Sequence, residues 1–472
     1  MDDSANVDLS IYTLETSKIQ LDCVVAVDFL CTKRRKHLSR YAMTNIALVV
    51  LDTLRKDAFD RHFDWLPGRR FERAFSTANW TVPAHASFFT GQYASEIGVH
   101  AKNMELDCDR PVLAERLSAA GYTTRAFSAN TNITGHFGFD RGFTDFRTPD
   151  GSEHLTDEEL FDWRRFSRET HTTGLQKYLE GVYECLRSDT KTIASLRMGL
   201  TFALDTQESV EYGGTLEAID EVQNIEFSDN EFLFINVMEA HEPYRVPPEY
   251  ATVEEPALTK SVGDISLEAV DGDQIQQAYD DCATYLSDCY NNLFDILSRD
   301  FDYIITLADH GEMLGEHGAW GHEHGVYKEL THVPLCVYGP GMDGTCSETV
   351  SLCDVYETVL DSAGINDSQG RGKTLLGTID DRECITEYLG LTTWSEQKLE
   401  ENGDETEREQ YDTTQRGYAV DEYYGYETID GYEETGETGI PSPKERLASI
   451  VAELTSELLR GILKFRMRSK PV

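Results

Sequence analysis

The most constraining feature of this chain is a short apolar run that leads into Asp-His-Gly and a histidine-rich stretch. Residues Tyr303–Leu307 have the length and composition of a buried strand, and Asp309, His310 and Gly311 follow almost at once. Five of the thirteen histidines lie between His310 and His332. Such a strand places a carboxylate and an imidazole at the carboxyl edge of a sheet, where ligands bind in open α/β folds. Asp and His also bind divalent cations, so the stretch predicts a metal site rather than a solvated loop.

Apolar runs of strand length alternate with amphipathic helical patterns along most of the chain. This alternation predicts an α/β fold with a mostly parallel central sheet and helices on both faces. The expected strands are Ile46–Leu51, Thr123–Ser128, Phe232–Met238, Tyr303–Leu307 and Val333–Val337. The expected helices are Ala84–Thr90, Leu113–Ala120 and Ile275–Leu297.

Changes in composition divide the chain into an extension, a catalytic domain and a smaller C-terminal unit. Met43 stands just before the first expected strand, so we interpret residues 1–42 as an extension upstream of the native start, outside the core. Residues 43–375 form the expected catalytic domain, with a polar, helical insertion at 150–230. Residues 376–472 are expected to form a C-terminal subdomain.

The expected C-terminal subdomain has its own sequence pattern. Tyrosines alternate with acidic residues across 417–436, which is typical of antiparallel strands with one solvated face. Glu445–Leu463 has the pattern of a closing amphipathic helix, and Glu396–Arg408 is charged enough to form a loop. We therefore predict a small α+β unit built on an antiparallel sheet.

The charge balance restricts the possible partners. The chain has 42 basic and 85 acidic residues, which gives a net charge of −43. Such a surface repels nucleic acid and anionic lipid, so neither is expected as a partner. Because the Debye length falls to about 3 Å at 1 M salt, self-repulsion is small in a salty medium. The composition indicates a salt-adapted protein of a halophile with a salty cytoplasm, with an ordinary acidic protein as the alternative.

The cysteines and apolar runs bear on the compartment. The ten cysteines show no CxxC pair and no zinc-ligand spacing. Cys282, Cys289 and Cys336 fall in apolar patterns of buried residues, which suits a reducing compartment. The apolar runs are too short to span a bilayer, and the N-terminus lacks the layout of a signal peptide. We therefore expect a cytoplasmic protein without a membrane span.

Further polar side chains stand at expected strand ends or helix starts. Asp52 follows the first strand directly, which suits either a metal carboxylate or the N-cap of the next helix. Thr81 precedes a helix start, where unpaired N–H groups can bind a tetrahedral anion, although it could serve only as the N-cap. His241 closes another strand-like run. As strand-end residues, they predict one site shared with the Asp-His-Gly loop.

The order and sequence of these segments resemble the sulfatase family of the alkaline-phosphatase-like superfamily. The most specific segment is Asp-His-Gly-Glu-Met-Leu-Gly-Glu-His-Gly at 309–318, followed by Val-Pro-Leu at 333–335 and Gly-Pro-Gly at 339–341. The Asp52 strand and residues 81–91 lie in the expected order, so the resemblance covers most of the expected catalytic domain. It implies a three-layer α/β sandwich, a divalent cation at the strand ends, and a nucleophile that attacks a sulfuryl or phosphoryl centre.

The resemblance also implies a role for each candidate residue. The cation would be one Ca, Mg or Mn ion, with Zn less expected, since the ligands are two carboxylates and one imidazole. Thr81 matches the nucleophile, and His241 and His322 match positions that contact the ester oxygens or protonate the leaving group. His85 is expected to help neutralise charge on the equatorial oxygens. The implied metal ligands are Asp52, Asp309, His310 and Thr81, and the implied catalytic residues are Thr81, His85, His241 and His322.

Residues 81–85, Thr-Val-Pro-Ala-His, depart from the family pattern Cys/Ser-x-Pro-x-Arg, in which the first residue is oxidised to formylglycine. Oxidation of a threonine would give a ketone rather than an aldehyde, and the Arg that marks the site for conversion is His85 here. An unmodified Thr81 alkoxide is therefore expected, as in phosphodiesterases and phosphotransferases of the superfamily. Thr53 stands where a second metal carboxylate often lies, so we expect a single-metal site.

The sequence thus predicts a metal-dependent hydrolase that acts on small-molecule or glycan esters of sulfate or phosphate. A phosphodiesterase or phosphotransferase of the same superfamily is the first alternative. A catalytically silent metal-binding module with the same fold is the second. Substrate, metal identity and oligomeric state stay open at this point.

Overall fold

The computed structural model describes residues 44–149, 161, 174–187, 192, 195–196, 213–256, 271–365, 370–393, 395–396, 399 and 405–468. The predicted extension at 1–42 lies outside these residues, as does much of the predicted insertion at 150–230. None of the described helices is both long and apolar enough to cross a membrane.

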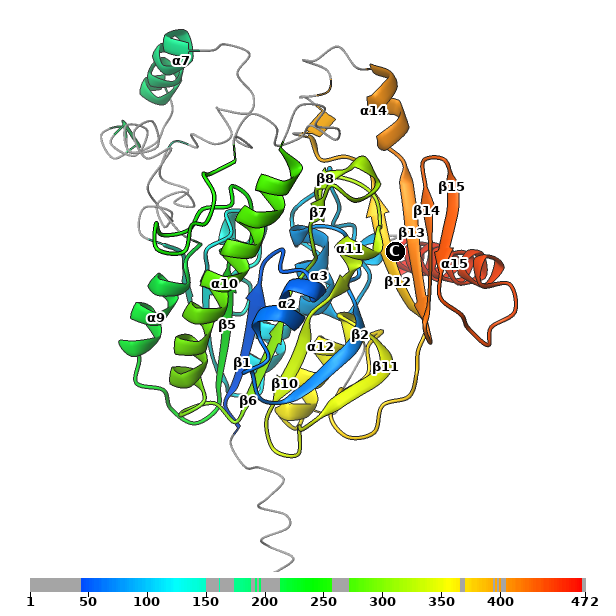
Figure 1. The fold of residues 1–472 in the computed structure, drawn as a ribbon, viewed down its shortest axis with the longest axis horizontal. Helices are drawn as coiled ribbons and strands as arrows, with labels where there is room; N and C mark the ends of the chain where they lie inside the picture. The colour runs from blue at the N-terminus through cyan, green and yellow to red at the C-terminus, as the bar shows by residue number, and fades with distance from the viewer. Residues whose placement is uncertain are drawn as a thin grey trace, which may run out of the picture. The chain divides into compact units, whose positions relative to one another are not determined.

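A nine-stranded sheet has the strand order β11-β2-β10-β6-β1-β5-β3-β4, with β9 paired to β2 (Figure 1). β1 pairs in parallel with β5 and β6, and β3 pairs in parallel with β5 and β4. The predicted α/β fold with a mostly parallel sheet is confirmed. The strands are β1 Ile46–Leu51, β2 Arg69–Phe75, β3 Thr123–Ser128, β4 Asp145–Arg147, β5 Glu231–Val237, β6 Tyr303–Leu307, β9 His332–Val333, β10 Leu335–Tyr338 and β11 Thr345–Ser351.

The strand predicted at 333–337 is wrong in detail, because Pro334 divides it into β9 and β10. β10 also runs antiparallel to both of its neighbours, β6 and β2. A parallel return usually needs a crossover helix, whereas the one α-helix in the fully described segment between β6 and β10 is the single turn of α11, Lys328–Thr331. The chain therefore returns beside β6 in the opposite direction.

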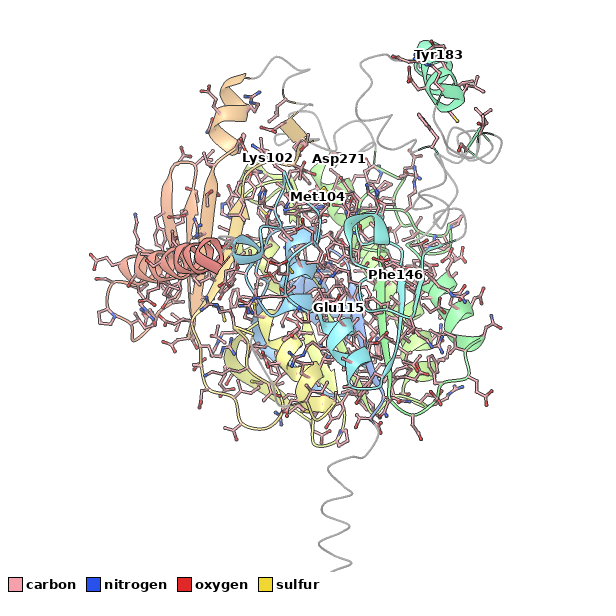
Figure 2. The ribbon with its side chains drawn as sticks, turned by 180° about the vertical axis from the view of Figure 1, so that it is seen from behind. Lys102, Met104, Glu115, Phe146, Tyr183 and Asp271 are labelled. Atoms are coloured by element: carbon pink, nitrogen blue, oxygen red, sulfur yellow. The ribbon has the colours of Figure 1, made fainter. Side chains whose placement is uncertain are left out.

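Helices cover both faces of the sheet and give three layers (Figures 1 and 2). α2 and α9 pack against α10 on one face, while α3, α5 and α12 pack together on the other. α9 lies inside the predicted insertion, so this part of it contributes to a helix layer. Apart from α11, the α-helices are α2 Lys56–His62, α3 Thr81–Thr90, α4 Ala94–Ile97, α5 Leu113–Ala119, α7 Gly174–Arg187, α9 Thr215–Gln223, α10 Gly272–Leu297, α12 Cys353–Ser362, α14 Glu405–Tyr411 and α15 Pro443–Arg468.

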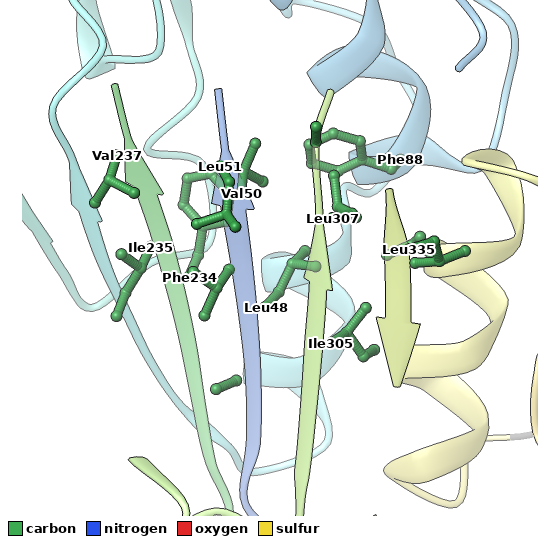
Figure 3. Close-up of a cluster of buried hydrophobic side chains, with 14 of the residues drawn as sticks. Leu48, Val50, Leu51, Phe88, Phe234, Ile235, Val237, Ile305, Leu307 and Leu335 are labelled. Carbon is green, nitrogen blue, oxygen red and sulfur yellow. The ribbon is translucent and has the colours of Figure 1, made fainter. Parts of the chain in front are cut away.

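The core lies between these layers. All six residues of β1 are buried, as expected for a central strand with helices on both faces. Figure 3 shows Leu48 of β1, Phe234 of β5 and Ile305 of β6 among the apolar side chains of this core. Each fully buried side chain of this kind contributes roughly 1.5–3 kcal/mol to folding. This packing holds β1, β5 and β6 in a register in which their carboxyl ends meet.

The C-terminal residues form a second, four-stranded antiparallel sheet in the order β12-β13-β14-β15, as predicted. The closing helix is present as α15. The loop predicted at 396–408 is wrong over its last residues, because α14 begins at Glu405. Two further short strands, β7 Met313–Leu314 and β8 Trp320–Gly321, pair within the loop after β6. The strands of the second sheet are β12 Cys384–Leu389, β13 Thr414–Val420, β14 Tyr423–Thr428 and β15 Gly431–Thr435.

Candidate metal centre and active site

Two aspartates follow neighbouring parallel strands of the central sheet. Asp52 comes directly after β1, and Asp309 comes two residues after the end of β6. The register pairs Val50 with Leu307, so the two strand ends lie side by side. Arg55, rather than Asp52, is the N-cap of α2. Both aspartates are fully buried.

Asp52, Asp309 and His310 bring three possible ligand atoms within 4.8 Å of one another. His310 Nε2 lies 3.5 Å from Asp309 Oδ2 and 3.8 Å from Asp52 Oδ1. Atoms that bind one ion at about 2.0–2.6 Å lie no more than ~5 Å apart. The spacing therefore fits one divalent cation.

The hydrogen bonding of His310 suits a ligand. Its Nδ1 lies 2.8 Å from the carbonyl oxygen of Gly311 and can only donate to it. A neutral ring then keeps its lone pair on Nε2, the nitrogen that faces the carboxylates. Burial lowers the pKa of His310, and the nearby His322 lowers it further, so the neutral ring is favoured.

Each of the two carboxylates keeps one oxygen that the described residues leave unsatisfied. Asp52 Oδ1 and Asp309 Oδ2 have no hydrogen-bond partner among the described residues. Burial raises the pKa of Asp52, and burial together with the nearby Asp52 carboxylate raises the pKa of Asp309. A divalent cation would satisfy both oxygens and keep both groups ionised. The residues present therefore fit the cation that the family resemblance implies.

Thr81 lies beside this group. It is the first residue of α3, and Trp80 is the N-cap, so Thr81 does not serve as the N-cap. Its Oγ1 is 3.2 Å from His310 Nε2, the nitrogen that also faces the two unsatisfied oxygens. The fold thus brings a hydroxyl, an imidazole and two carboxylates to one point at a helix N-terminus.

Two asparagines that sequence reasoning missed hold Asp52. Asn130 Nδ2 donates to Asp52 Oδ2 at 2.8 Å, and Asn236 Nδ2 lies 3.5 Å from the same oxygen. Asn236 is a fully buried amide inside the otherwise apolar strand β5, and Asn130 lies two residues after β3. The sequence offered two signals for them: Asn236 is a polar residue within a largely apolar run, and Asn130 closely follows a strand-like run.

The backbone of Thr53 holds Asp309. Its N–H donates to Asp309 Oδ1 at 3.3 Å, and its own hydroxyl donates to the carbonyl oxygen of Asp52 at 2.7 Å. Thr53 has φ of 58°, which is unusual for a β-branched residue. Thr53 therefore supports the site through its backbone, at the position where members of the family often have a second metal carboxylate.

His85 occupies a different environment from the one predicted. It is fully buried in α3, with Nδ1 2.9 Å from the carbonyl oxygen of Thr81 and Nε2 2.8 Å from Asn236 Nδ2. Nδ1 therefore donates and Nε2 accepts, so both nitrogens have protein partners. Burial lowers the pKa of His85 to about 3 and leaves it neutral. This geometry argues against the predicted neutralisation of substrate charge by His85, and it links the backbone of Thr81 to Asn236.

His322 and His241 lie next to the three-residue group. The ring centroid of His322 is 4.6 Å from that of His310 and 5.0 Å from that of His241. The buried carboxylate of Glu312 lies 2.9 Å from His322 Nδ1. Burial alone would lower the pKa of His322, but Glu312 and two neighbouring glutamates outweigh it and raise this pKa to about 10. His322 is thus a cation near neutral pH.

The remaining histidines of the stretch have aromatic neighbours instead. Their ring centroids lie 4.6–5.1 Å from those of aromatic side chains. These pairs are His317 with Tyr327, His324 with Tyr411, and His332 with Phe75.

Several solved structures share the fold. A phosphonate monoester hydrolase from Silicibacter pomeroyi is 19% identical with a TM-score of 0.54, over 90% of this chain and 96% of the other. The phosphonate monoester hydrolase of Agrobacterium radiobacter is 17% identical with a TM-score of 0.58, over 89% of this chain and 96% of the other. A 2-O glycosaminoglycan sulfatase is 14% identical with a TM-score of 0.55, over 90% and 94%. At these identities the likeness concerns the fold.

The sequence comparisons give a family but no individual relative. No curated protein matches the chain at a significant level. The model of the Sulfatase family matches residues 57–365, which is more than half of the chain. This match agrees with the sheet topology and with the group of residues at the strand ends that could hold a metal ion. The chain belongs to the sulfatase family.

Proposed function

We propose that this protein is a metal-dependent hydrolase of sulfate or phosphate esters with the unmodified hydroxyl of Thr81 as its nucleophile. The observation that carries the proposal is the 3.2 Å distance between Thr81 Oγ1 and His310 Nε2, beside two buried carboxylates with unsatisfied oxygens. Asp52, Asp309 and His310 would hold one divalent cation, with Thr81 next to it. Ca, Mg and Mn are the cations that we expect there.

A bound divalent cation would lower the pKa of the nucleophilic hydroxyl and polarise the ester. Thr81 gives up its hydroxyl proton to solvent, and its oxygen bonds to sulfur or phosphorus while the bond to the leaving oxygen breaks. Glu312 engages His322 Nδ1, so Nε2 is the nitrogen that donates a proton to the leaving oxygen. His241 contacts the ester oxygens. Water attacks the esterified Thr81, releases the sulfate or phosphate product and restores the hydroxyl.

The charges around the site favour an ester with one negative charge. The hydrogen bonds and ion pairs of Asp52, Asp309 and His310 with described residues involve neither Lys nor Arg. Glu312 lies beside His322. Burial of Glu242 and the nearby charge of Glu312 raise the pKa of Glu242 to about 7. A dianionic phosphate monoester would meet these carboxylates with little compensation beyond the cation and His322. A small-molecule or glycan sulfate, phosphodiester or phosphonate monoester suits the site better.

A phosphodiesterase or phosphotransferase is the second candidate, and the chemistry of Thr81 favours it. A threonine cannot yield the aldehyde hydrate that sulfatases with a converted Cys or Ser use. Among the solved structures of similar fold, two are named phosphonate monoester hydrolases, which makes phosphorus esters reasonable substrates. In a transferase, an acceptor alcohol would replace water in the second step.

The decisive experiment is a hydrolysis panel of aryl sulfate, phosphate monoester, phosphate diester and phosphonate monoester, in high salt with Mg, Ca or Mn. We expect turnover of at least one singly charged ester, loss of turnover after chelation, and recovery when the cation is restored. Addition of an alcohol separates hydrolase from transferase, since a transferase yields the alkyl ester. A protein that binds a cation tightly and turns over none of the esters would instead be the silent metal-binding module.

Peptide mass spectrometry tests the nucleophile directly. The peptide that contains Thr81 should have the unmodified mass of its sequence, and a singly charged substrate analogue that traps the intermediate should add its sulfuryl or phosphoryl group at Thr81. An oxidised residue at this position would overturn the proposal of an unmodified nucleophile.

We further propose that the protein works in a salty, reducing cytoplasm. The net charge of −43 and the burial of Cys282, Cys289 and Cys336 support this proposal. Because salt screens repulsion between surface carboxylates, the unfolding temperature should rise between about 0.1 M and 1 M KCl. An unfolding temperature that does not change with salt would point to an ordinary acidic protein.

A further inference from the structure

Tyr279 of α10 holds the turn that follows β1, although it lies outside the site itself. Its hydroxyl accepts a hydrogen bond from the N–H of Arg55 at 2.8 Å and donates one to the carbonyl oxygen of Thr53 at 2.9 Å. The side chain is buried, and its ring packs edge to face on Tyr244 with a centroid separation of 5.5 Å. One buried hydroxyl therefore binds the backbone of the turn at two residues, Thr53 and Arg55.

The turn needs such support because it is strained. Thr53 has φ of 58°, a left-handed conformation that β-branched residues rarely adopt. Strained residues persist only where the surrounding structure over-determines them. Here the carbonyl of Thr53 bonds to Tyr279, while its N–H bonds to Asp309 Oδ1. Removal of the Tyr279 hydroxyl would leave the buried Thr53 carbonyl and Arg55 N–H without this partner.

The same turn connects the two buried carboxylates. Asp52 is its first residue, and the Thr53 N–H holds Asp309 by one oxygen while the other stays unsatisfied. Arg55 extends the connection, because its guanidinium donates to the carbonyl oxygen of Glu312 at 3.0 Å, in the loop after β6. A shift of the turn would therefore move both carboxylates relative to each other.

We propose that Tyr279 is a positioning residue for the cation: its hydroxyl locks the strained turn and so keeps Asp52 and Asp309 at the separation that one divalent ion needs. Tyr279 acts through the backbone of Thr53 and Arg55 and touches neither carboxylate. This inference rests on the cation site of the proposed function.

The test is cation binding by folded, chelator-treated protein, measured by calorimetric titration with Mn, Mg and Ca ions separately. Tyr279→Phe keeps the ring and removes only the hydroxyl. Loss of residues that orient metal ligands typically weakens binding about 10–100-fold, and we expect that range for this variant. Tyr290→Phe is the matched control, because Tyr290 is also buried on α10 but its hydroxyl pairs with Thr306, away from the turn. It should keep the wild-type affinity within about twofold.

A double-mutant cycle separates positioning from general damage. Thr53→Gly relieves the strain, since glycine adopts positive φ readily, and Tyr279 should then matter much less. Tyr279→Phe in the Thr53→Gly background should therefore change cation affinity by less than about threefold. If Tyr279→Phe alone does not fold, the double variant must fold and bind the cation.

The outcomes distinguish this inference from the function beneath it. A wild-type protein that binds none of the three cations would overturn the cation site and this inference with it. Binding by wild type and equally by Tyr279→Phe would overturn the inference alone. Equal losses in Tyr279→Phe and Tyr290→Phe, or additive losses in the cycle, would also overturn it.

Discussion

The molecule contains two pairs of buried carboxylates whose surroundings differ. At the strand ends, Asp52 and Asp309 each keep an oxygen without a described hydrogen-bond partner. At the junction with the C-terminal sheet, Asp354 accepts from the N–H of Ser351 and Lys373 and forms an ion pair with Arg382.

Glu387 completes the second pair. It is buried and accepts from the N–H of Ser95 at 3.1 Å and from the hydroxyl of the same residue at 2.8 Å. Burial raises the pKa of all four carboxylates. In the junction pair both oxygens of each carboxylate have a partner among the described residues, whereas each strand-end carboxylate keeps one oxygen without a partner. The difference indicates that the junction pair stabilises the fold, whereas the strand-end pair is arranged for a ligand.

Replacement of the proposed nucleophile should have the largest effect. Thr81→Ala should lower kcat/KM by about 10³-fold or more, because the covalent route is lost. Thr358→Ala is the control at the junction, where the Thr358 hydroxyl donates to the carbonyl oxygen of Asp354 at 2.7 Å. It should lower the unfolding temperature and leave the kinetics unchanged. Equal kinetics for Thr81→Ala and wild type on every ester would remove Thr81 from the mechanism.

Asp354→Asn tests the compensated pair. Loss of the carboxylate leaves the mostly buried Arg382 guanidinium without its ion-pair partner, so the free energy of unfolding should fall by roughly 3 kcal/mol. Chemical denaturation measures this change. Cation affinity should be unaffected, and a large loss of it would show that the two regions are not separable.

Asp309→Asn should act in the opposite direction on the uncompensated pair. Cation affinity should fall by more than about 100-fold, since a direct ligand is lost. The cation-free protein should be as stable as wild type or more stable by about 1 kcal/mol, because a buried repulsion disappears. Denaturation in a chelator measures this, and a loss as large as that of Asp354→Asn would erase the distinction.

Glu239 lies between the two classes, and its effect should depend on pH. One of its oxygens accepts from the N–H of Thr215 at 2.6 Å, and the other has no described partner. Burial raises its pKa from 4.5 to about 7. The folded state therefore binds its proton more tightly, so this contribution is present below about pH 4.5 and is lost as the pH rises to about 7.

Glu239→Gln removes this titration. The free energy of unfolding of wild type, relative to that of the variant, should fall by roughly 3 kcal/mol across this pH window. The measurement is denaturant unfolding at several pH values. Parallel curves for the two proteins would mean that Glu239 does not titrate in this way.

Much of the fold could be predicted because its strands and helices have strong local signals. The apolar runs at 46–51 and 303–307 are too regular to be anything but buried strands, and both have the predicted bounds. The Asp-His-Gly loop also predicted a ligand site at one strand end, because its Asp and His follow an apolar run in the sequence. The division of 333–337 at Pro334 and the reversal of β10 were not predictable, since pairing direction depends on distant partners.

The supporting residues of the candidate site were harder to find. Asn236 lies 184 positions from Asp52 in sequence, and Tyr279 lies 226 positions from Thr53. The local sequence around Asn236 or Tyr279 does not predict which distant residue each one contacts. His85 was expected to help neutralise charge on the ester oxygens, but burial lowers its pKa and leaves its ring neutral.

By itself, the sequence determined the α/β class, the strand ends that carry polar groups, and the absence of a Cys, Ser or Arg from residues 81–85. These properties are local or compositional, so they survive without knowledge of the fold. Only the tertiary structure decided that Asp52 and Asp309 face each other unsatisfied and that Tyr279 locks the turn between them. Such properties depend on burial and on contacts between distant segments, and desolvation assigns each buried group its charge only once the fold has closed around it.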